Sequence, residues 1–219
     1  MLIQYYGDFC FKITTKPGGR ATEDVVIWTD PLTKGAGLRS PQGNPDVLIA
    51  SHEDPKNPID SKDGSIVLNM PGEYSVLGIG FQGYPSFRDS SAGSERGQNT
   101  VFTFESEDLH MVYLGALGHE LSPDMLDKIT NTDILFLPIA GKDTLTTALA
   151  VDLVKKIEPK VIIPMHFAMS GLTLATVQPP KEFAQALGAT SGETVAKLNL
   201  KKKDLEGKTM EVIFMERGS

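Results

Sequence analysis

The 219-residue sequence predicts a layered α/β fold in which two β-sheets pack together and helices cover the outer faces. Short apolar runs with period-two character fill the first half of the chain, and this pattern is typical of strands. From about residue 122 onward, strand-like runs alternate with segments that carry helix caps and helical periodicity. These patterns indicate mixed α/β layers, but they do not give a strand order.

The strands expected in the first half are short and are separated by turn residues. Gly7 and Asp8 predict a tight hairpin, and Leu77 and Gly78 predict another. Residues 84–99 are polar and carry several glycines, so they are predicted to form a long loop, a feature that is more often functional than idle. The expected strands cover residues 2–6, 9–14, 25–29, 47–50, 65–69, 73–81 (as a hairpin), 100–105 and 110–114.

The second half is expected to alternate between strands and helices. Ser122 is predicted to cap a helix that runs to residue 129, with a proline at its first position. Asp143 is predicted to cap a second helix that ends at Pro159, and a third helix should stop at Gly188 after starting near residue 180. The strands expected here cover residues 134–137, 161–163 and 210–215.

Composition limits the function classes. The net charge of −7 and the pI of about 5.1 argue against nucleic acid as a partner, because phosphate backbones repel an acidic protein. Cys10 is the only cysteine, so no intramolecular disulfide is possible, which fits a reducing compartment. No apolar run reaches the roughly 18 residues of a membrane span, and the amino terminus lacks the pattern of a signal peptide. We therefore expect a cytoplasmic protein with no membrane partner, folded as a single domain over residues 1–219.

A candidate site follows the buried strand expected at 47–50. The strand ends at Ser51 and His52, and the next residues are polar or proline, so the chain becomes a loop there. Layered α/β folds place polar, titratable side chains at the carboxyl ends of buried strands. His52 is thus a candidate site residue, and the alternative is a histidine that only caps the strand.

This segment resembles the metal-binding segment of the metallo-β-lactamase family, which has the form H-x-H-x-D-H and binds two metal ions. The same frame here is His52-Glu53-Asp54-Pro55-Lys56-Asn57, so only His52 is retained. Asp54 and Asn57 stand where histidines are expected, and Lys56 stands where the acid is expected.

Further segments are similar to the predicted zinc-dependent hydrolase branch of that family, the branch that includes L-ascorbate-6-phosphate lactonase. The resemblance covers roughly residues 2–167 and implies a four-layer αββα sandwich of the metallo-β-lactamase type. The matching segments are Gly7–Phe11, Asp30–Pro31, Pro71–Tyr74, Pro85–Asp89, Arg96–Asn99, Leu114–His119 and Pro164–Phe167.

The resemblance also implies a ligand set. His52 and His166 match the first and last ligands, whereas Arg88 stands in place of a histidine and Ala116 in place of the bridging aspartate. A divalent site needs neutral imidazoles and ionised carboxylates, so a guanidinium and an alanine argue that the dinuclear site is lost. No metal is therefore expected. If one is bound, the expected ligands are His52, Asp54, Asp89 and His166.

Two functions remain open. The first is a non-catalytic relative, a pseudoenzyme with a degenerate metal site, that binds a small molecule, possibly anionic, or a protein partner. The alternative is a hydrolase of ester, lactone or phosphodiester bonds that uses zinc or another divalent ion at a reduced, mononuclear site. Whether the protein is an enzyme is thus left undecided.

The binding residues expected for either function come from loops at one edge of the sandwich. Lys56 and Arg88 should converge on the cavity that the two histidines border. They form either an anion site or a closed cluster neutralised by nearby acids. The expected set is His52, Asp54, Lys56, Asn57, Arg88, Asp89 and His166.

Overall fold

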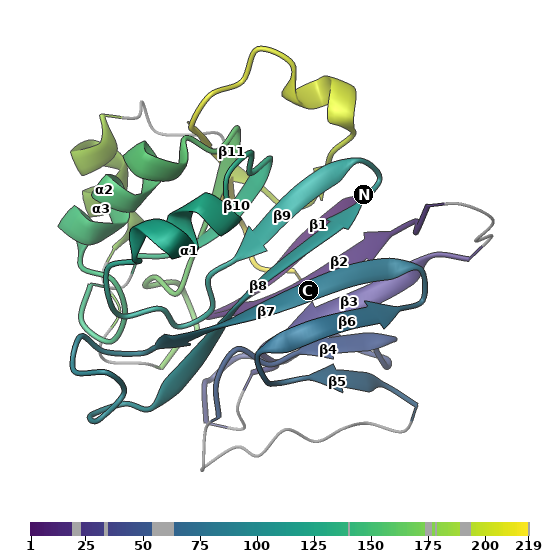
Figure 1. The fold of residues 1–219 in the computed structure, drawn as a ribbon, viewed down its shortest axis with the longest axis horizontal. Helices are drawn as coiled ribbons and strands as arrows, with labels where there is room; N and C mark the ends of the chain where they lie inside the picture. Colours follow the sequence, from purple (N-terminus) through teal and green to yellow (C-terminus); the bar gives the residue numbers. More distant parts are fainter. Residues whose placement is uncertain are drawn as a thin grey trace.

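Two large β-sheets face each other in the computed structural model of the chain (Figure 1). The structure describes residues 1–18, 23–32, 35–53, 64–139, 141–173, 177, 179–188 and 194–218. Asp54, Lys56 and Asn57 lie outside these residues, so the structure places neither Lys56 nor the closed cluster expected around it.

The first sheet is built mainly from the N-terminal part of the chain, in the order β13-β1-β2-β3-β4-β5. Strand β2 runs antiparallel to both of its neighbours, β1 and β3, whereas β3, β4 and β5 are parallel to one another. The strands are β1 (Leu2–Gly7), β2 (Cys10–Thr15), β3 (Val25–Thr29), β4 (Val47–Ile49), β5 (Ile66–Leu68) and β13 (Leu198–Asn199).

The second sheet has the order β14-β11-β10-β9-β8-β7-β6. Strands β6 to β9 form an antiparallel meander, whereas β9, β10, β11 and β14 run parallel. The strands are β6 (Gly72–Val76), β7 (Ile79–Phe87), β8 (Gln98–Ser106), β9 (Leu109–Tyr113), β10 (Ile134–Pro138), β11 (Val161–Met165) and β14 (Glu211–Val212). A small third sheet pairs β12 (Thr194–Val195) with β15 (Phe214–Met215).

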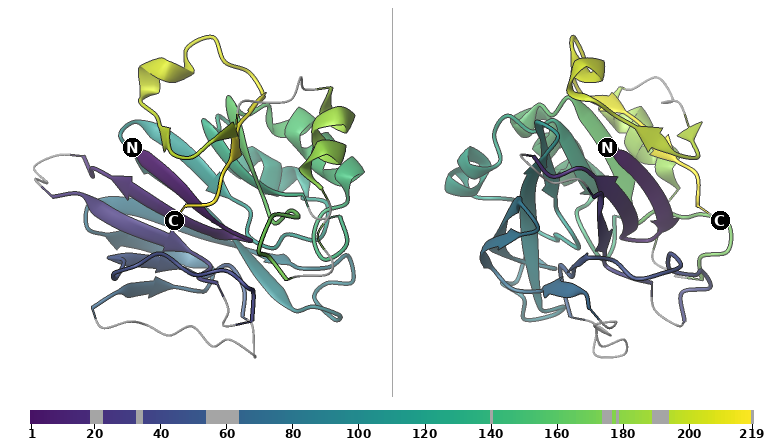
Figure 2. Two further views of the ribbon diagram at one scale, coloured as in Figure 1. Left: turned by 180° about the vertical axis from the view of Figure 1, so that it is seen from behind. Right: turned by 90° about the vertical axis from the view of Figure 1, so that its right-hand side faces the viewer.

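The described α-helices all come from the second half of the chain and lie together beside β10 and β11, away from the first sheet (Figures 1 and 2). They are α1 (Pro123–Lys128), α2 (Thr147–Ile157) and α3 (Pro180–Leu187), and a 3-10 helix, η1 (Lys202–Leu205), follows. Ser122 caps α1 as expected, and Gly188 ends α3 in the left-handed conformation. None of the helices in the described segments is long and apolar enough to cross a bilayer.

The core lies between the two sheets. Inward-facing side chains of both sheets form one contiguous apolar cluster, and aromatic rings join the sheets across it. Phe11 of β2 meets Phe136 of β10 edge to face, with ring centroids 4.8 Å apart. The buried face of α2 covers the outside of the second sheet. The expected fold class, two packed sheets with helices outside them, is therefore confirmed.

Three expected elements differ in their bounds. The loop expected at 84–99 is wrong, because β7 continues to Phe87 and pairs with β8 from Gln98, which leaves only residues 88–97 as a loop. The cap of α2 is Thr146, whose hydroxyl accepts a hydrogen bond from the Leu149 amide, and not Asp143. The strand expected at 210–215 is split into β14 and β15, which pair in different sheets.

Candidate functional site

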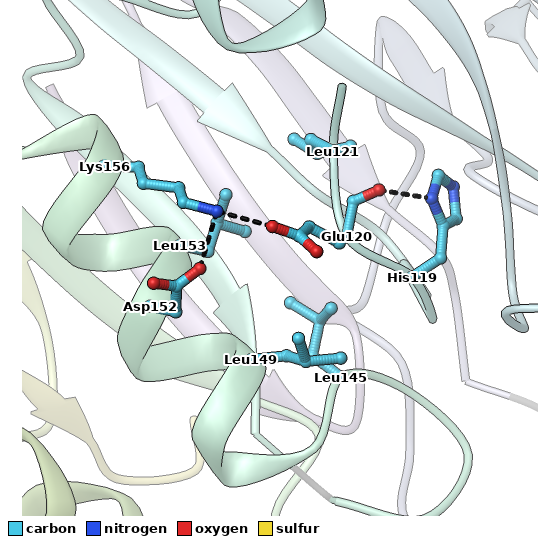
Figure 3. A pocket seen from close by; sticks show the side chains of 8 residues that line it. All are labelled: His119, Glu120, Leu121, Leu145, Leu149, Asp152, Leu153 and Lys156. Atoms are coloured by element: carbon cyan, nitrogen blue, oxygen red, sulfur yellow. Dashed lines mark hydrogen bonds and ion pairs between the residues drawn. The ribbon is translucent and has the colours of Figure 1, made fainter. Parts of the chain in front are cut away.

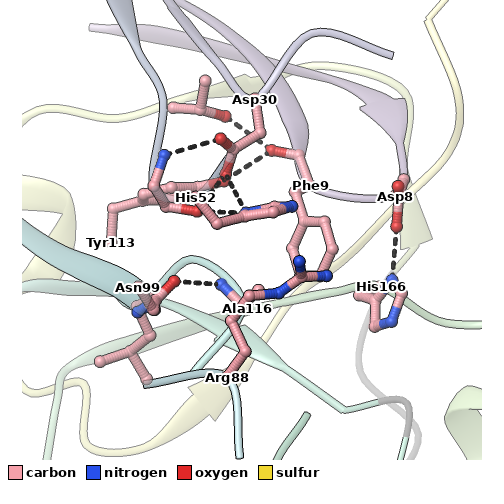
Figure 4. Close-up of polar contacts among 12 residues, drawn as sticks. Asp8, Phe9, Asp30, His52, Arg88, Asn99, Tyr113, Ala116 and His166 are labelled. Atoms are coloured by element: carbon pink, nitrogen blue, oxygen red, sulfur yellow. Dashed lines mark hydrogen bonds and ion pairs between the residues drawn. The ribbon is translucent and has the colours of Figure 1, made fainter. Parts of the chain in front are cut away.

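The candidate site lies where strand ends of both sheets meet at one edge of the sandwich (Figure 4). Asp30 follows β3, His52 follows β4, and His166 follows β11. The start of β8 is joined to the end of β4 by a hydrogen bond from the Thr100 amide to the Ser51 carbonyl oxygen (2.7 Å). Because parallel strands end on the same side of a sheet, the topology gathers these side chains at one edge.

Asp30 is the centre of a buried polar network. Its Oδ1 accepts the Ser51 amide at 2.7 Å, and its Oδ2 accepts the Ser51 hydroxyl at 2.6 Å and the Tyr113 hydroxyl at 2.6 Å. Tyr113 ends β9, so this carboxylate ties the first sheet to the second. Burial, with a further contribution from Asp30, raises the pKa of the Tyr113 phenol, which therefore stays protonated and acts as a donor.

This network fixes the tautomer of His52. A carboxylate can only accept hydrogen bonds, so the Ser51 hydroxyl must donate to Asp30. The Ser51 oxygen is then left to accept from Nδ1 of His52, 2.9 Å away. Burial lowers the pKa of His52, and the Arg88 charge acts in the same direction while Asp30 opposes it. The ring is therefore neutral near pH 7 and carries its free lone pair on Nε2.

His166 is held in the same way from the opposite side of the site. Its Nδ1 donates to the carboxylate of Asp8, and its backbone amide donates to the Asp8 carbonyl oxygen at 2.8 Å. Its Nε2 is buried and has no hydrogen-bond partner among the described residues. A buried ring nitrogen without a partner is costly in an apolar setting, so this atom marks a place where a ligand would be favoured.

Backbone strain accompanies both histidine partners. Asp8, Asp30 and His166 have φ values of 55°, 30° and 53°, in the left-handed region that non-glycine residues seldom adopt. Strain of this kind persists only where surrounding contacts enforce it, and it concentrates at functional sites.

The Phe9 ring lies between the two imidazoles. It stacks on His166 with centroids 4.2 Å apart and meets His52 edge-on at 5.4 Å. Phe9 is 5% exposed, so it excludes water from the space between the histidines. The hairpin turn of β1 and β2 thus supplies both the partner of His166, which is Asp8, and the apolar wall of the site.

Arg88 enters the site from the end of β7. Its backbone amide donates to the Gly97 carbonyl oxygen at 3.1 Å, and its Nη1 donates to the Arg96 carbonyl oxygen at 3.4 Å. The side chain extends toward the part of the site that contains His52 (Figure 4), whose pKa its charge lowers.

Asp89 does not join this group. Its two carboxylate oxygens accept four backbone N–H groups of its own loop, those of Ser91, Gly93, Glu95 and Arg96. These bonds lower its pKa against the opposing effect of burial, and they hold the 88–97 loop in shape. Asp89 was expected from sequence as a ligand if a metal is bound; in the structure its carboxylate is bound instead by the backbone of its own loop.

Ala116 lies in the segment 114–118, which follows β9 and is called the strap below because it packs across the site. It is fully buried, and its amide donates to Oδ1 of Asn99 at 2.8 Å. A Cβ at Gly115 would lie 2.3 Å from the Cβ of Ser51, and a Cβ at Gly118 would lie 2.0 Å from the Arg88 carbonyl oxygen. The two glycines therefore let the strap pack directly on the residues that precede His52 and Asp89.

The described residues do not fit a dinuclear metal centre. The structure brings together His52, Arg88, Ala116 and His166, so two of four mapped ligand positions carry an imidazole and the others carry a guanidinium and a methyl group. Within the described ranges, no cluster of three or more His, Cys, Asp or Glu residues could hold an ion. Each imidazole nevertheless has its Nδ1 engaged, His52 by the Ser51 hydroxyl and His166 by the Asp8 carboxylate, and so offers Nε2 as metal-ligating histidines do. Asp54, the candidate for a further ligand, lies outside the described residues.

Sequence reasoning missed several site residues, namely Asp8 and Asp30 as histidine partners, Phe9 as the wall, and Asn99 and Tyr113 as hydrogen-bond partners. Asp8 and Asp30 each follow a strand-like run, which is the available signal, but nothing in the sequence indicates which histidine each would meet.

His119 has a structural role. Its Nε2 accepts a hydrogen bond from the Phe87 amide at 3.1 Å, and its Nδ1 donates to the Glu120 carbonyl oxygen at 2.8 Å. It borders a small hollow against α2, where Lys156 pairs with Glu120 and Asp152 (Figure 3). Both ring nitrogens are used, so this histidine has no free lone pair for a ligand.

Two packed sheets with candidate ligands at their strand ends define the metallo-β-lactamase type of hydrolase fold. The chain belongs to the beta-lactamase superfamily, since the family model described as "Beta-lactamase superfamily domain" matches residues 2–166. The resemblance found in the sequence is thereby confirmed.

Individual relatives and a solved structure support the same family assignment. A UPF0173 protein of Pyrococcus abyssi is 28% identical over 189 residues, covering 78% of this chain and 85% of the relative. A UPF0173 metal-dependent hydrolase of Bacillus mycoides is 24% identical over 231 residues, covering 89% and 96%. A solved structure from Thermotoga maritima, assigned as a Zn-dependent hydrolase of the metallo-beta-lactamase superfamily, is 28% identical with a TM-score of 0.75, covering 98% of each chain.

The chain is therefore a metallo-β-lactamase-fold member of a family whose relatives are named metal-dependent hydrolases. These names give no support to the expectation that no metal is bound, and a divalent ion is consistent with them.

Proposed function

We propose that the protein is a metal-dependent hydrolase with a reduced site that holds one divalent ion, with His52 and His166 as its retained imidazole ligands. The observation that carries the proposal is the hydrogen-bonding pattern that the two rings share. The Nδ1 of His52 donates to the Ser51 hydroxyl, which donates to Asp30, and the Nδ1 of His166 donates directly to Asp8. The Nε2 of each ring therefore keeps a lone pair that a metal ion can accept. The family membership supports the hydrolase class, and the bond cleaved is an ester, lactone or phosphodiester.

The residues of this chain have distinct roles in the proposal. A bound divalent ion would supply Lewis-acid chemistry, polarising a substrate oxygen and making water more acidic. Asp30, acting through Ser51, and Asp8 hold the two imidazoles in the tautomer that offers Nε2. Phe9 keeps the space between them apolar, which strengthens electrostatic interactions there.

Metal binding tests the proposal without relying on activity. Protein stripped with chelator and dialysed would be titrated with Zn²⁺ or Mn²⁺ by calorimetry, and its metal content would be measured after gel filtration. We expect one ion per chain, with binding weakened at least about 100-fold in His52→Ala and in His166→Ala, since each substitution removes a direct ligand. Hydrolysis of p-nitrophenyl acetate, a homoserine lactone and bis-p-nitrophenyl phosphate would be measured in parallel.

His110→Ala is the matched control, because His110 is a half-buried histidine near the start of β9, whereas that strand contacts the site through its last residue, Tyr113. It should bind the ion as wild type does. Metal binding that survives both site substitutions, or hydrolysis that persists in chelator, would contradict the proposal.

A second candidate is the non-catalytic relative that binds a small ligand. The observation that favours it is Ala116, which is fully buried at the position of the family's bridging aspartate and offers no donor atom. This candidate predicts that stripped protein binds its ligand as well as loaded protein does, and that no substrate in the panel is hydrolysed.

A further inference from the structure

We propose that Tyr5 is a positioning residue, whose hydroxyl holds the backbones of Asp8 and His166 so that the His166 ring keeps its Nδ1 on the Asp8 carboxylate and its Nε2 available to a ligand. The inference rests on the proposed function, because it concerns one of the two imidazole ligands named there. Tyr5 is fully buried, so it acts through His166 and does not itself meet a substrate.

The Tyr5 hydroxyl lies between the backbones of the two residues that form the histidine–acid pair. It donates to the Asp8 carbonyl oxygen at 2.8 Å, and it accepts from the His166 amide at 3.3 Å. The His166 amide also donates to the Asp8 carbonyl oxygen at 2.8 Å, so the three groups are bonded to one another. Burial, followed by the negative charge of Asp8, raises the pKa of the phenol, so its proton stays on the oxygen and is available to Asp8.

These bonds join the two large sheets at the site. Tyr5 lies on β1 of the first sheet, whereas His166 follows β11 of the second. The donor hydroxyl and the Asp8 carbonyl oxygen belong to the first sheet and its hairpin turn, and the His166 amide belongs to the second. The place of His166 relative to its acid partner is therefore set across the interface between the sheets, and not by either strand alone.

The backbone held in this way is strained on both sides. Asp8 has a φ of 55° and His166 has a φ of 53°, and neither is a glycine. Residues leave this conformation unless the surrounding contacts enforce it. The pairing of β1 with β2 does not fix Asp8 by itself, because its register shifts between Tyr5 and Gly7. The Tyr5 hydroxyl supplies one of the contacts that hold both residues in place.

The ring of Tyr5 is held independently of its hydroxyl. It stacks on Phe11 with centroids 4.7 Å apart, and it packs on Phe167, the residue after His166, at 5.7 Å. Tyr5→Phe therefore removes the hydroxyl contacts and leaves the aromatic packing in place, which makes it a selective substitution.

Loss of the hydroxyl takes away one of the two donors to the Asp8 carbonyl oxygen and one of the two acceptors of the His166 amide. With fewer contacts to enforce the strained turn, the Asp8 carboxylate should no longer hold Nδ1 of His166 in every molecule. We expect the ring to populate the tautomer with its proton on Nε2, an atom that then has no lone pair for an ion. Zinc should bind about 10-fold more weakly, because groups that orient a metal-ligating histidine typically contribute that much or more to affinity.

The nitrogen resonances of His166 report its tautomer directly. A long-range ¹H–¹⁵N spectrum would be recorded on chelator-treated wild type and Tyr5→Phe, and Zn²⁺ binding to both would be measured by calorimetry. We expect the neutral His166 ring to carry its proton on Nδ1 in wild type and to be a mixture of the two tautomers in Tyr5→Phe, with the His52 signals unchanged. In wild type, the Tyr5 hydroxyl proton should be visible and give a nuclear Overhauser effect to the His166 amide proton, a measurement that needs no variant.

Thr132→Val is the matched control, because Thr132 is also buried and its hydroxyl also donates to a backbone carbonyl oxygen, that of Ile129, at 2.6 Å. It lies before the start of β10, and β10 runs parallel to β11, so it is at the opposite end of the sheet from His166. The substitution should lower stability in urea unfolding without changing the His166 tautomer or the zinc affinity.

The same His166 tautomer in wild type and Tyr5→Phe would overturn the positioning role, whatever the zinc affinities of the two proteins. A Tyr5 hydroxyl proton that exchanges freely with solvent in wild type, or an equal change of tautomer in Thr132→Val, would overturn it as well. A change of tautomer confined to Tyr5→Phe, with no zinc bound by wild type, would remove the proposed hydrolase and leave the positioning of His166 in place. Zinc binding by wild type with an unchanged tautomer in Tyr5→Phe would do the reverse.

Discussion

Replacing Tyr113 with phenylalanine removes a hydroxyl that connects the second sheet to the candidate site. The phenol is fully buried and donates to Oδ2 of Asp30 at 2.6 Å. A hydrogen bond to a charged group contributes about 1.5–3 kcal/mol to stability, so Tyr113→Phe should lower the free energy of unfolding by about 2 kcal/mol. Asp30→Asn weakens three bonds at once and should lower it by about 3 kcal/mol.

The double variant separates this bond from its surroundings. The Tyr113–Asp30 bond is removed or weakened in both single variants, so its contribution is counted twice when the two effects are added. We therefore expect the double variant to lose about 4 kcal/mol and not about 5, which is a coupling of roughly 1 kcal/mol.

Urea unfolding followed by the fluorescence of Trp28 measures these values, because Trp28 is the only tryptophan and is buried on β3. The midpoint should shift without a change in slope. Tyr74→Phe is the control, since its hydroxyl donates to the Met70 carbonyl oxygen at an exposed position, and it should change stability by less than about 0.5 kcal/mol. Additive effects of Tyr113→Phe and Asp30→Asn would refute the assigned bond.

Three further predictions concern the scaffold. Gly118→Ala places a methyl carbon 2.0 Å from the Arg88 carbonyl oxygen and should cost at least about 2 kcal/mol in urea unfolding, whereas Gly80→Ala, with nothing within 4 Å, should cost less than about 1. Burial opposes ionisation of Asp133, but a bond from the His110 amide and ion pairs with Lys160 and Lys202 outweigh it and lower its pKa below 3.8. The stability from this carboxylate is therefore present above pH 3.8 and lost as pH falls through the folded pKa, so Asp133→Asn should be less stable than wild type at pH 7 and approach it in acid. Burial raises the pKa of the Cys10 thiol, so it should react with Ellman's reagent only after the protein is unfolded.

Much of the fold follows from local pattern, and the exceptions have physical causes. The strands at 25–29, 47–50 and 161–163 were predictable because short apolar runs rich in β-branched residues favour a β-strand over other secondary structures. The second half of β7 was not, because Gly83, Pro85 and Ser86 break the apolar pattern although the backbone still pairs with β8. The start of α2 was misplaced because Leu145 is held instead by a bond from its amide to the Leu117 carbonyl oxygen, a contact outside the helix.

The closeness of His52 and His166 was expected from sequence, but their hydrogen-bond partners were not. His52 was a candidate because a titratable residue follows a buried strand, and His166 because it matches a family motif at the end of the last long strand. Their acid partners were not identified, since His166 and Asp8 are 158 residues apart and only the folded topology joins them. Asp89 was assigned to the site from its neighbourhood in sequence, but four amides of its own loop compete more effectively for its oxygens.

Imidazole nitrogen resonances test the central claim most directly, namely that His52 and His166 both offer an Nε2 lone pair to one ion. The chain has four histidines, so His52→Ala and His166→Ala spectra would assign the two signals of interest in a long-range ¹H–¹⁵N experiment on chelator-treated protein. We predict that both rings carry a proton on Nδ1, where each has its hydrogen-bond partner, and that both Nε2 signals shift together and saturate at one equivalent of Zn²⁺. A proton on Nε2 of either ring, a shift of only one ring, or saturation at two equivalents would contradict the account.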